Sequence, residues 1–476
     1  MENETTVTVE TPFGTIRGLQ RGPTQVFKGI RFATAERFCP PQPVTGWAGE
    51  YDATAYRSQC PQSIGMMEQA LGTGPLPMDE DCLHLNVFTP GCGPATRPVL
   101  VWIHGGGFTS GTGAMPWYDG SALCALGDVV VVTLNYRLGA LGYAGPGNFG
   151  THDQVAALRW VNQQIAAFGG DPGNVTIFGE SAGGSAVVSL LAVPAATGLF
   201  QRGFAMSPSI KQLRSRDRAE AALADYLLAA KASSLAELAQ ADVGRILDAQ
   251  AALLREGGAG FTGFSPCTDG DLIPDPMLEA AAANPTPLVL GTTRDEMALF
   301  TAFDPTLGRL DDGELNGIFD RRFGEGADAA RALYATARPG HTLRQIVSAM
   351  QTDEMFRVPA QRLAEQRVTA GSPTWMYWFT WATPAFGGVL GSCHAVDIPF
   401  AFHNLDRKGV PEFTGTSAQR TAVADAYSGA VLAFARTGDP GWQRYDTVSR
   451  PTRRFDLATE TIEDPEHVLR ELWMAS

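Results

Sequence analysis

Residues 168–184 read Phe-Gly-Gly-Asp-Pro-Gly-Asn-Val-Thr-Ile-Phe-Gly-Glu-Ser-Ala-Gly-Gly. A turn leads into the short apolar strand 175–178, which ends in Gly179-Glu180-Ser181-Ala182-Gly183. A serine between two glycines, where a strand meets a helix, has the sequence form of a nucleophile elbow. The turn is so tight that neighbouring side chains would collide, so glycines flank the serine and leave its hydroxyl exposed. The stretch therefore predicts a serine hydrolase that attacks a carbonyl carbon.

Continuous apolar runs on both sides of this stretch predict a mostly parallel, doubly wound sheet, because such strands are covered by helices on both faces. Helical spacing of apolar residues predicts a crossover helix before the elbow, at 151–168, and a long helix near the end of the chain, at 417–436. Short β signals around 12–14 predict a small N-terminal antiparallel meander. The runs read as strands are 99–103, 128–134, 175–178, 287–291 and 375–379.

The rest of the chain reads as helical elaboration of one α/β domain that covers residues 1–476. Alanine-rich segments around 210–260 and charged segments around 305–370 predict helical insertions or a cap over the sheet. No repeat or low-complexity linker divides the chain.

Composition argues against two classes of partner. The formal net charge of −14 disfavours nucleic acid and anionic membranes, which would repel the surface. Residues 1–6 lack the basic region and apolar core of a secretory signal, so a cytoplasmic protein is expected. Seven cysteines are too few for a disulfide scaffold.

A serine hydroxyl needs a base that takes its proton and an acid that orients the base. We predict His394 as the base, because it follows the strand 375–379 in a loop that could face the elbow. The acid should come between serine and histidine, after a strand end. Strand 287–291 is followed by Asp295 and Glu296, and the spacing does not choose between them.

The developing oxyanion needs N–H donors aimed at it. His104-Gly105-Gly106-Gly107-Phe108 follows a predicted strand, and its glycines let the backbone approach a substrate closely. The amide of Ala182, directly after the serine, would complete the hole.

Taken together, these motifs resemble the type-B carboxylesterases of the α/β-hydrolase superfamily, in particular bacterial para-nitrobenzyl esterases and, more distantly, cholinesterases. The resemblance spans nearly the whole chain in the family's order. Its blocks are 27–30, 80–87, 102–108, 148–154, 168–184 and 394–400.

The resemblance implies an α/β-hydrolase fold and a triad of Ser181, His394 and Glu296, with oxyanion donors at Gly106, Gly107 and Ala182. It places Glu180 and Ser207 behind the catalytic groups. Cys60 and Cys82 stand where secreted relatives close a disulfide, and thiols are expected here in a reducing cytosol. Leu299 replaces an aromatic residue of choline-hydrolysing relatives, which disfavours cholinesterase activity. Residues that could line an apolar pocket are Met66, Met67, Leu71, Trp117, Leu299, Phe300 and Phe303.

The sequence thus predicts a cofactor-independent hydrolase of small to medium, largely apolar carboxylic esters. An amidase or carbamate hydrolase with the same triad is the nearest alternative. A non-catalytic, cholinesterase-like binding protein is a second, although all three triad residues are present. Walker A, dinucleotide-binding and His-Glu-x-x-His motifs are missing, so neither a nucleotide nor a metal is expected. The expected partner is a small ester, with the oligomeric state, monomer or dimer, left open.

Overall fold

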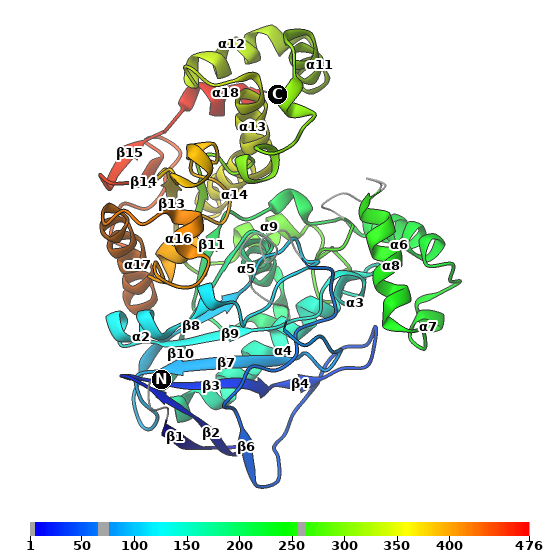
Figure 1. Ribbon diagram of the computed structural model, residues 1–476, viewed down its shortest axis with the longest axis vertical. Helices are drawn as coiled ribbons and strands as arrows, with labels where there is room; N and C mark the ends of the chain where they lie inside the picture. The colour runs from blue at the N-terminus through cyan, green and yellow to red at the C-terminus, as the bar shows by residue number, and fades with distance from the viewer. Residues whose placement is uncertain (1–4, 65–75, 256–262, 476) are drawn as a thin grey trace.

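The computed structural model describes residues 5–64, 76–255 and 263–475, and a large mixed sheet forms its centre (Figure 1). In these ranges thirteen strands make one sheet, with β6 (Glu50–Asp52) paired to β2 beside the main path. The path runs β1 (Thr5–Thr11), β2 (Gly14–Arg21), β3 (Thr24–Arg31), β7 (His84–Thr89), β9 (Val130–Leu134), β8 (Arg97–Ile103), β10 (Gly170–Glu180), β11 (Arg202–Met206), β12 (Leu288–Thr293), β13 (Thr374–Phe379), β14 (Pro451–Phe455) and β15 (Glu460–Glu463).

The strands from β9 to β14 along this path are parallel, and antiparallel pairs close both edges. The antiparallel pairing of β1 with β2 and of β2 with β3 confirms the predicted N-terminal meander. The structure therefore confirms the predicted α/β class with a mostly parallel sheet.

Alternating residues of the central strands feed two separate cores. In β8, Val99, Val101 and Ile103 pack on one face, in a core shared with helices α4 (Phe149–Gln164) and α5 (Ala182–Ala192). Leu100 and Trp102 pack on the other face, in a core shared with α17 (Gln419–Thr437). Burial on both faces explains why these strands read as unbroken apolar runs in the sequence.

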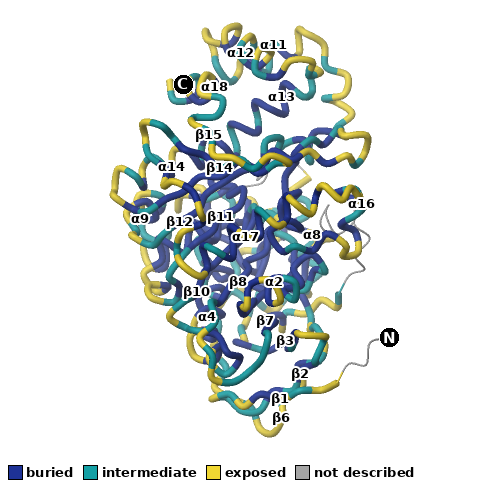
Figure 2. The backbone as a smooth tube through the Cα atoms, turned by 90° about the vertical axis from the view of Figure 1, so that its left-hand side faces the viewer, coloured by how far each residue is buried: buried dark blue, intermediate teal, exposed yellow. Residues whose placement is uncertain are grey.

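Helical segments extend beyond the sheet on two sides. On one side lie α6 (Arg216–Ala229), α7 (Leu235–Leu238) and α8 (Val243–Arg255). On the other lie α11 (Asp312–Phe323), α12 (Ala327–Ala337), α13 (Leu343–Thr352), the π-helix η8 (Asp353–Arg357) and α14 (Val358–Thr369), joined by the C-terminal helix α18 (His467–Ala475). Helices α11 to α13 and α18 share a small third core. The tube of Figure 2 is dark over the central strands and pale over α11 and α12.

No described helix is both long enough and apolar enough to cross a lipid bilayer. Cys60 and Cys82 are buried free thiols, and Cys60 Sγ lies 3.3 Å from the Leu138 amide that donates to it.

Candidate active site

Ser181 occupies the turn between β10 and α5, as the elbow motif predicts. Its backbone adopts φ 59° and ψ −119°, and its amide donates to the Met206 carbonyl of β11 at 2.9 Å. A positive φ at a residue other than glycine is strained and is typical of functional turns. A Cβ at Gly183 would come within 2.0 Å of the Ile103 carbonyl, so glycine is required there. The glycine at position 183 therefore allows the first turn of α5 to pack directly against the end of β8.

His394 and Glu296, which lie far apart in the sequence, form a buried hydrogen bond. The Nδ1 of His394 donates to Glu296 Oε2 at 2.5 Å, and the His394 amide donates to the Glu296 carbonyl at 3.3 Å. The other carboxylate oxygen, Oε1, accepts the Thr293 amide at 2.7 Å. Glu296 is fully buried and His394 is nearly so. Both ends of the carboxylate are thus fixed, and the imidazole is held in one orientation.

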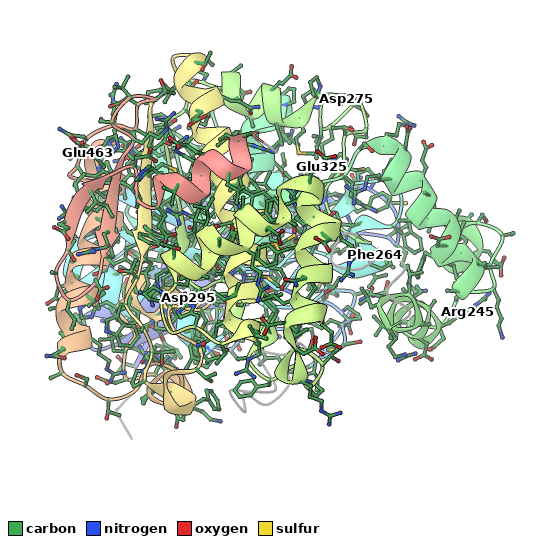
Figure 3. All side chains as sticks on the ribbon, turned by 90° about the horizontal axis from the view of Figure 1, so that it is seen from above. Arg245, Phe264, Asp275, Asp295, Glu325 and Glu463 are labelled. Atoms are coloured by element: carbon green, nitrogen blue, oxygen red, sulfur yellow. The ribbon has the colours of Figure 1, made fainter. Side chains whose placement is uncertain are left out.

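Asp295 faces away from this pair. Its Oδ2 accepts the Ser392 amide at 2.8 Å and the Arg294 guanidinium at 2.9 Å. Viewed from above, Asp295 lies left of the centre of the molecule, whereas Arg245 of α8 lies at the right-hand edge (Figure 3). The sequence spacing did not choose between Asp295 and Glu296 as the partner of His394. In the structure only Glu296 of the two contacts the imidazole.

The glycine-rich loop after β8 lies directly against the elbow. A Cβ at Gly105 would be 3.2 Å from the Ser181 Cβ. Gly106 has φ 107°, and a Cβ there would lie 2.1 Å from the Ser110 carbonyl, so this loop conformation needs glycine. Within the described chain the amides of Gly106, Gly107 and Ala182 donate to no other group. These three donors are available to a ligand at the elbow.

Two further carboxyl groups, Glu180 and Asp397, share the buried site with His394. Burial raises the pKa of both, and of Glu180 above neutrality. Burial alone would lower the pKa of His394, but Glu180 and Glu296 outweigh it and raise that pKa. Tyr377 and Tyr427 donate to Asp397 Oδ2 at 3.1 and 3.2 Å. Asp397 was missed as a site residue, although it stands only three positions after His394.

The second imidazole nitrogen of His394 points toward the elbow. Nε2 lies 3.2 Å from Glu180 Oε1, outside hydrogen-bond geometry, and Glu180 directly precedes Ser181. The Ser181 hydroxyl makes no hydrogen bond to any residue of the described ranges. Ser207 follows β11 with a positive φ and is buried, but its hydroxyl is likewise without a partner within those ranges. The structure therefore brings Glu180, Ser181 and His394 together without a formed Ser181–His394 hydrogen bond.

Aromatic rings cover the imidazole. The ring centroids of Phe300 and Phe356 lie 5.5 and 4.8 Å from that of His394. Phe356 carried no signal in the sequence, because only the fold brings η8 to the histidine.

The other predicted pocket residues are placed differently. Trp117 is buried and stacks on Phe413 within the core that α17 shares. Leu299 is half-buried against the same core. Phe303 is largely exposed and packs edge-on against Phe386. Met66, with Met67 and Leu71, lies outside the described residues.

No cluster of three His, Cys, Asp or Glu side chains suited to a metal occurs in the part of the chain that the structure describes.

Comparison with known proteins gives a consistent assignment. The model of the carboxylesterase family matches residues 5–464. The chain is 36% identical to the para-nitrobenzyl esterase of Bacillus subtilis over 97% of both chains, and 35% identical to the phenmedipham hydrolase of Pseudarthrobacter oxydans over 90% of both. The crystal structure of the Geobacillus stearothermophilus carboxylesterase EST55 superposes with a TM-score of 0.87 at 36% identity, covering 98% of this chain and 99% of that one. The chain therefore belongs to the carboxylesterase family and is an ester-hydrolysing enzyme of the α/β-hydrolase fold.

Proposed function

We propose that this enzyme hydrolyses small to medium, largely apolar carboxylic esters through a Ser181–His394–Glu296 triad and an acyl-enzyme. The observation that carries the proposal is the buried hydrogen bond of 2.5 Å from His394 to Glu296, with the opposite imidazole nitrogen turned to the elbow. A carboxylate that accepts a hydrogen bond from Nδ1–H keeps the ring proton on that nitrogen and leaves Nε2 free to act as a base.

The reaction begins when the Ser181 hydroxyl attacks the ester carbonyl. Its proton passes to Nε2 of His394 as the Oγ–carbon bond forms, and Glu296 stabilises the imidazolium. The amides of Gly106, Gly107 and Ala182 donate to no other acceptor in the described ranges, so they can donate to the oxyanion. The tetrahedral intermediate collapses, and the alcohol leaves with the proton from His394.

Water completes the cycle. His394 takes a proton from the water as its oxygen attacks the acyl carbonyl, and returns it to Ser181 Oγ as the acid is released. The Ser181–His394 hydrogen bond that this needs is expected to form with substrate bound, since catalytic hydrogen bonds are often longer in the free enzyme.

The surroundings of His394 support an apolar substrate. Phe300 and Phe356 place two aromatic rings on the imidazole, so the surroundings of the proposed base are partly apolar. The name of the Bacillus subtilis relative, para-nitrobenzyl esterase, fits such a substrate.

The test replaces the nucleophile. Ser181→Ala should lower kcat for a chromogenic aryl ester by about 10⁴-fold or more, and it should abolish labelling by a fluorophosphonate. Ser189→Ala is the matched control, because Ser189 lies on the same helix with its hydroxyl bonded to the Ser185 carbonyl. Undiminished hydrolysis by the Ser181→Ala protein would refute the proposal.

A further inference from the structure

The π-helix η8 connects the catalytic histidine to the C-terminal segment of the chain. π-Helical turns are rare and are frequently found at functional sites. In η8, Phe356 packs on the His394 ring. The next residue, Arg357, instead contacts Glu466 and Pro465 near the C-terminus. Just before η8, Thr352 Oγ1 accepts the amide of Met297, the neighbour of Glu296, at 3.0 Å. The turn therefore contacts the loops of both His394 and Glu296.

Arg357 is buried and held from three sides. Its guanidinium donates to the Glu466 carboxylate and to the Pro465 carbonyl. It also lies over the Trp378 ring of β13, with its carbon 4.6 Å from the ring centroid. A planar guanidinium with ionic, backbone and aromatic partners has little freedom to move. Its fixed position holds the end of η8 against the sheet.

Glu466 is the residue that brings the chain end into this arrangement. It precedes α18 and pairs with Arg338 through both carboxylate oxygens as well as with Arg357. Its backbone adopts φ 57°, in the left-handed region that disfavours a side chain. Strain of this kind persists where the surrounding contacts require it. The side chain of Glu466 is only slightly exposed, so its pairs are weakly screened.

A second contact chain supports the same turn from its other end. Asp353, the first residue of η8, accepts the Tyr334 hydroxyl at 2.6 Å. Tyr334 in turn accepts the Trp473 indole N–H of α18 at 2.7 Å. The C-terminal segment 466–475 therefore contacts η8 at both ends, through Glu466 at Arg357 and through Trp473 and Tyr334 at Asp353. Figure 1 shows α18 lying beside α12 and α13, away from the sheet.

We propose that the Arg357–Glu466 ion pair positions the catalytic histidine by holding η8 so that Phe356 fixes the His394 ring. Glu466 and Arg357 are positioning residues, and Phe356 is the side chain through which they act. The inference rests on the proposed function, in which His394 is the general base, and it gives the C-terminal segment a part in turnover.

The test is a double-mutant cycle between Glu466→Gln and Phe356→Leu, with kcat and KM measured on a chromogenic aryl ester. Each single change should lower kcat by about 10- to 100-fold, the usual effect of misplacing a catalytic group, with KM within about twofold of wild type. The double variant should be no slower than the slower single variant, because both act through one contact.

Glu354→Gln is the matched control. Glu354 lies in the same π-helix and pairs with Arg322 and Lys211, on partners that do not contact His394. Its kcat should stay within about twofold of wild type, since partly exposed ion pairs contribute little.

Three results would overturn the inference: wild-type kcat in Phe356→Leu, single effects that multiply in the double variant, or a Glu354→Gln loss as large as that of Glu466→Gln. If Glu466→Gln does not fold, Arg357→Lys takes its place in the cycle, because lysine keeps the charge but loses the planar guanidinium that donates to Glu466 and Pro465. Failure of the proposed function looks different, because Ser181→Ala would then still hydrolyse the ester, whatever the η8 variants do.

Discussion

Replacing Glu296 by glutamine should force His394 into the wrong tautomer. Glu296 Oε1 accepts the Thr293 amide at 2.7 Å, so the carbonyl oxygen of the glutamine must occupy that position. Its NH₂ group then stands where Oε2 accepted the hydrogen bond from Nδ1–H. An NH₂ donor opposite Nδ1 requires that nitrogen to be an acceptor, which moves the ring proton to Nε2. A protonated Nε2 cannot take the proton of Ser181.

The size of the loss follows from this change of tautomer. The equivalent amide substitution in a serine protease triad costs about 10⁴-fold in kcat with the geometry intact. That factor corresponds to about 5.4 kcal/mol of transition-state stabilisation at about 1.36 kcal/mol for each tenfold. Because the site is buried, water does not offer His394 a substitute partner, so we expect Glu296→Gln to lose about 10⁴-fold.

The assay is steady-state hydrolysis of a chromogenic aryl acetate, with thermal unfolding measured on each variant. Asp295→Asn is the matched control, because Asp295 is the adjacent carboxylate and binds Ser392 and Arg294 instead of the imidazole. It should keep kcat within about tenfold of wild type, as expected of a group outside the reacting atoms. A Glu296→Gln enzyme within tenfold of wild type, or a larger loss in Asp295→Asn, would refute the reasoning.

Three further experiments, a pH–rate profile, a substitution and a substrate comparison, have expected outcomes. The raised pKa of His394 should place the acid limb of kcat/KM above the ordinary imidazole value of about 6.5, and an acid limb at or below that value would contradict this. Gly106→Ala should lower kcat by about 10²- to 10³-fold, because a Cβ 2.1 Å from the Ser110 carbonyl displaces an oxyanion donor, and wild-type kcat would exclude that role. A matched ester and amide should differ in kcat/KM in favour of the ester, since the amine is the poorer leaving group, and equal rates would favour the amidase alternative.

The fold followed from the sequence because its signals are local. The apolar runs at 99–103 and 375–379 are strands β8 and β13, buried on both faces. The elbow could also be predicted from the sequence, because a Cβ at Gly179 or Gly183 would clash with neighbouring backbone atoms. Strand β12 extends to Thr293, two residues beyond the predicted apolar run. The apolar pattern misses these last two residues because they are threonines, although both are buried.

Much of the site depended on contacts between distant segments, which spacing does not contain. Asp295 and Glu296 differ only in which meets Ser392 and which meets His394, and the fold decides that. Phe356 contacts the imidazole from a π-helical turn, which the spacing of apolar residues in the sequence does not predict. Whether an aromatic residue such as Trp117 packs in a core is likewise decided by distant contacts, here with Phe413.

Acid-quenched mass spectrometry of the enzyme during turnover of an aryl acetate would detect the acyl-enzyme on Ser181 itself. Residues 160–202 form one tryptic peptide, between Arg159 and the cleavage site after Arg202, and this peptide contains Ser181, Ser185 and Ser189. We expect one acetyl group on this peptide, and fragmentation should assign it to Ser181. An acetyl group on another residue, or turnover with no acylated enzyme at any quench time, would contradict this expectation.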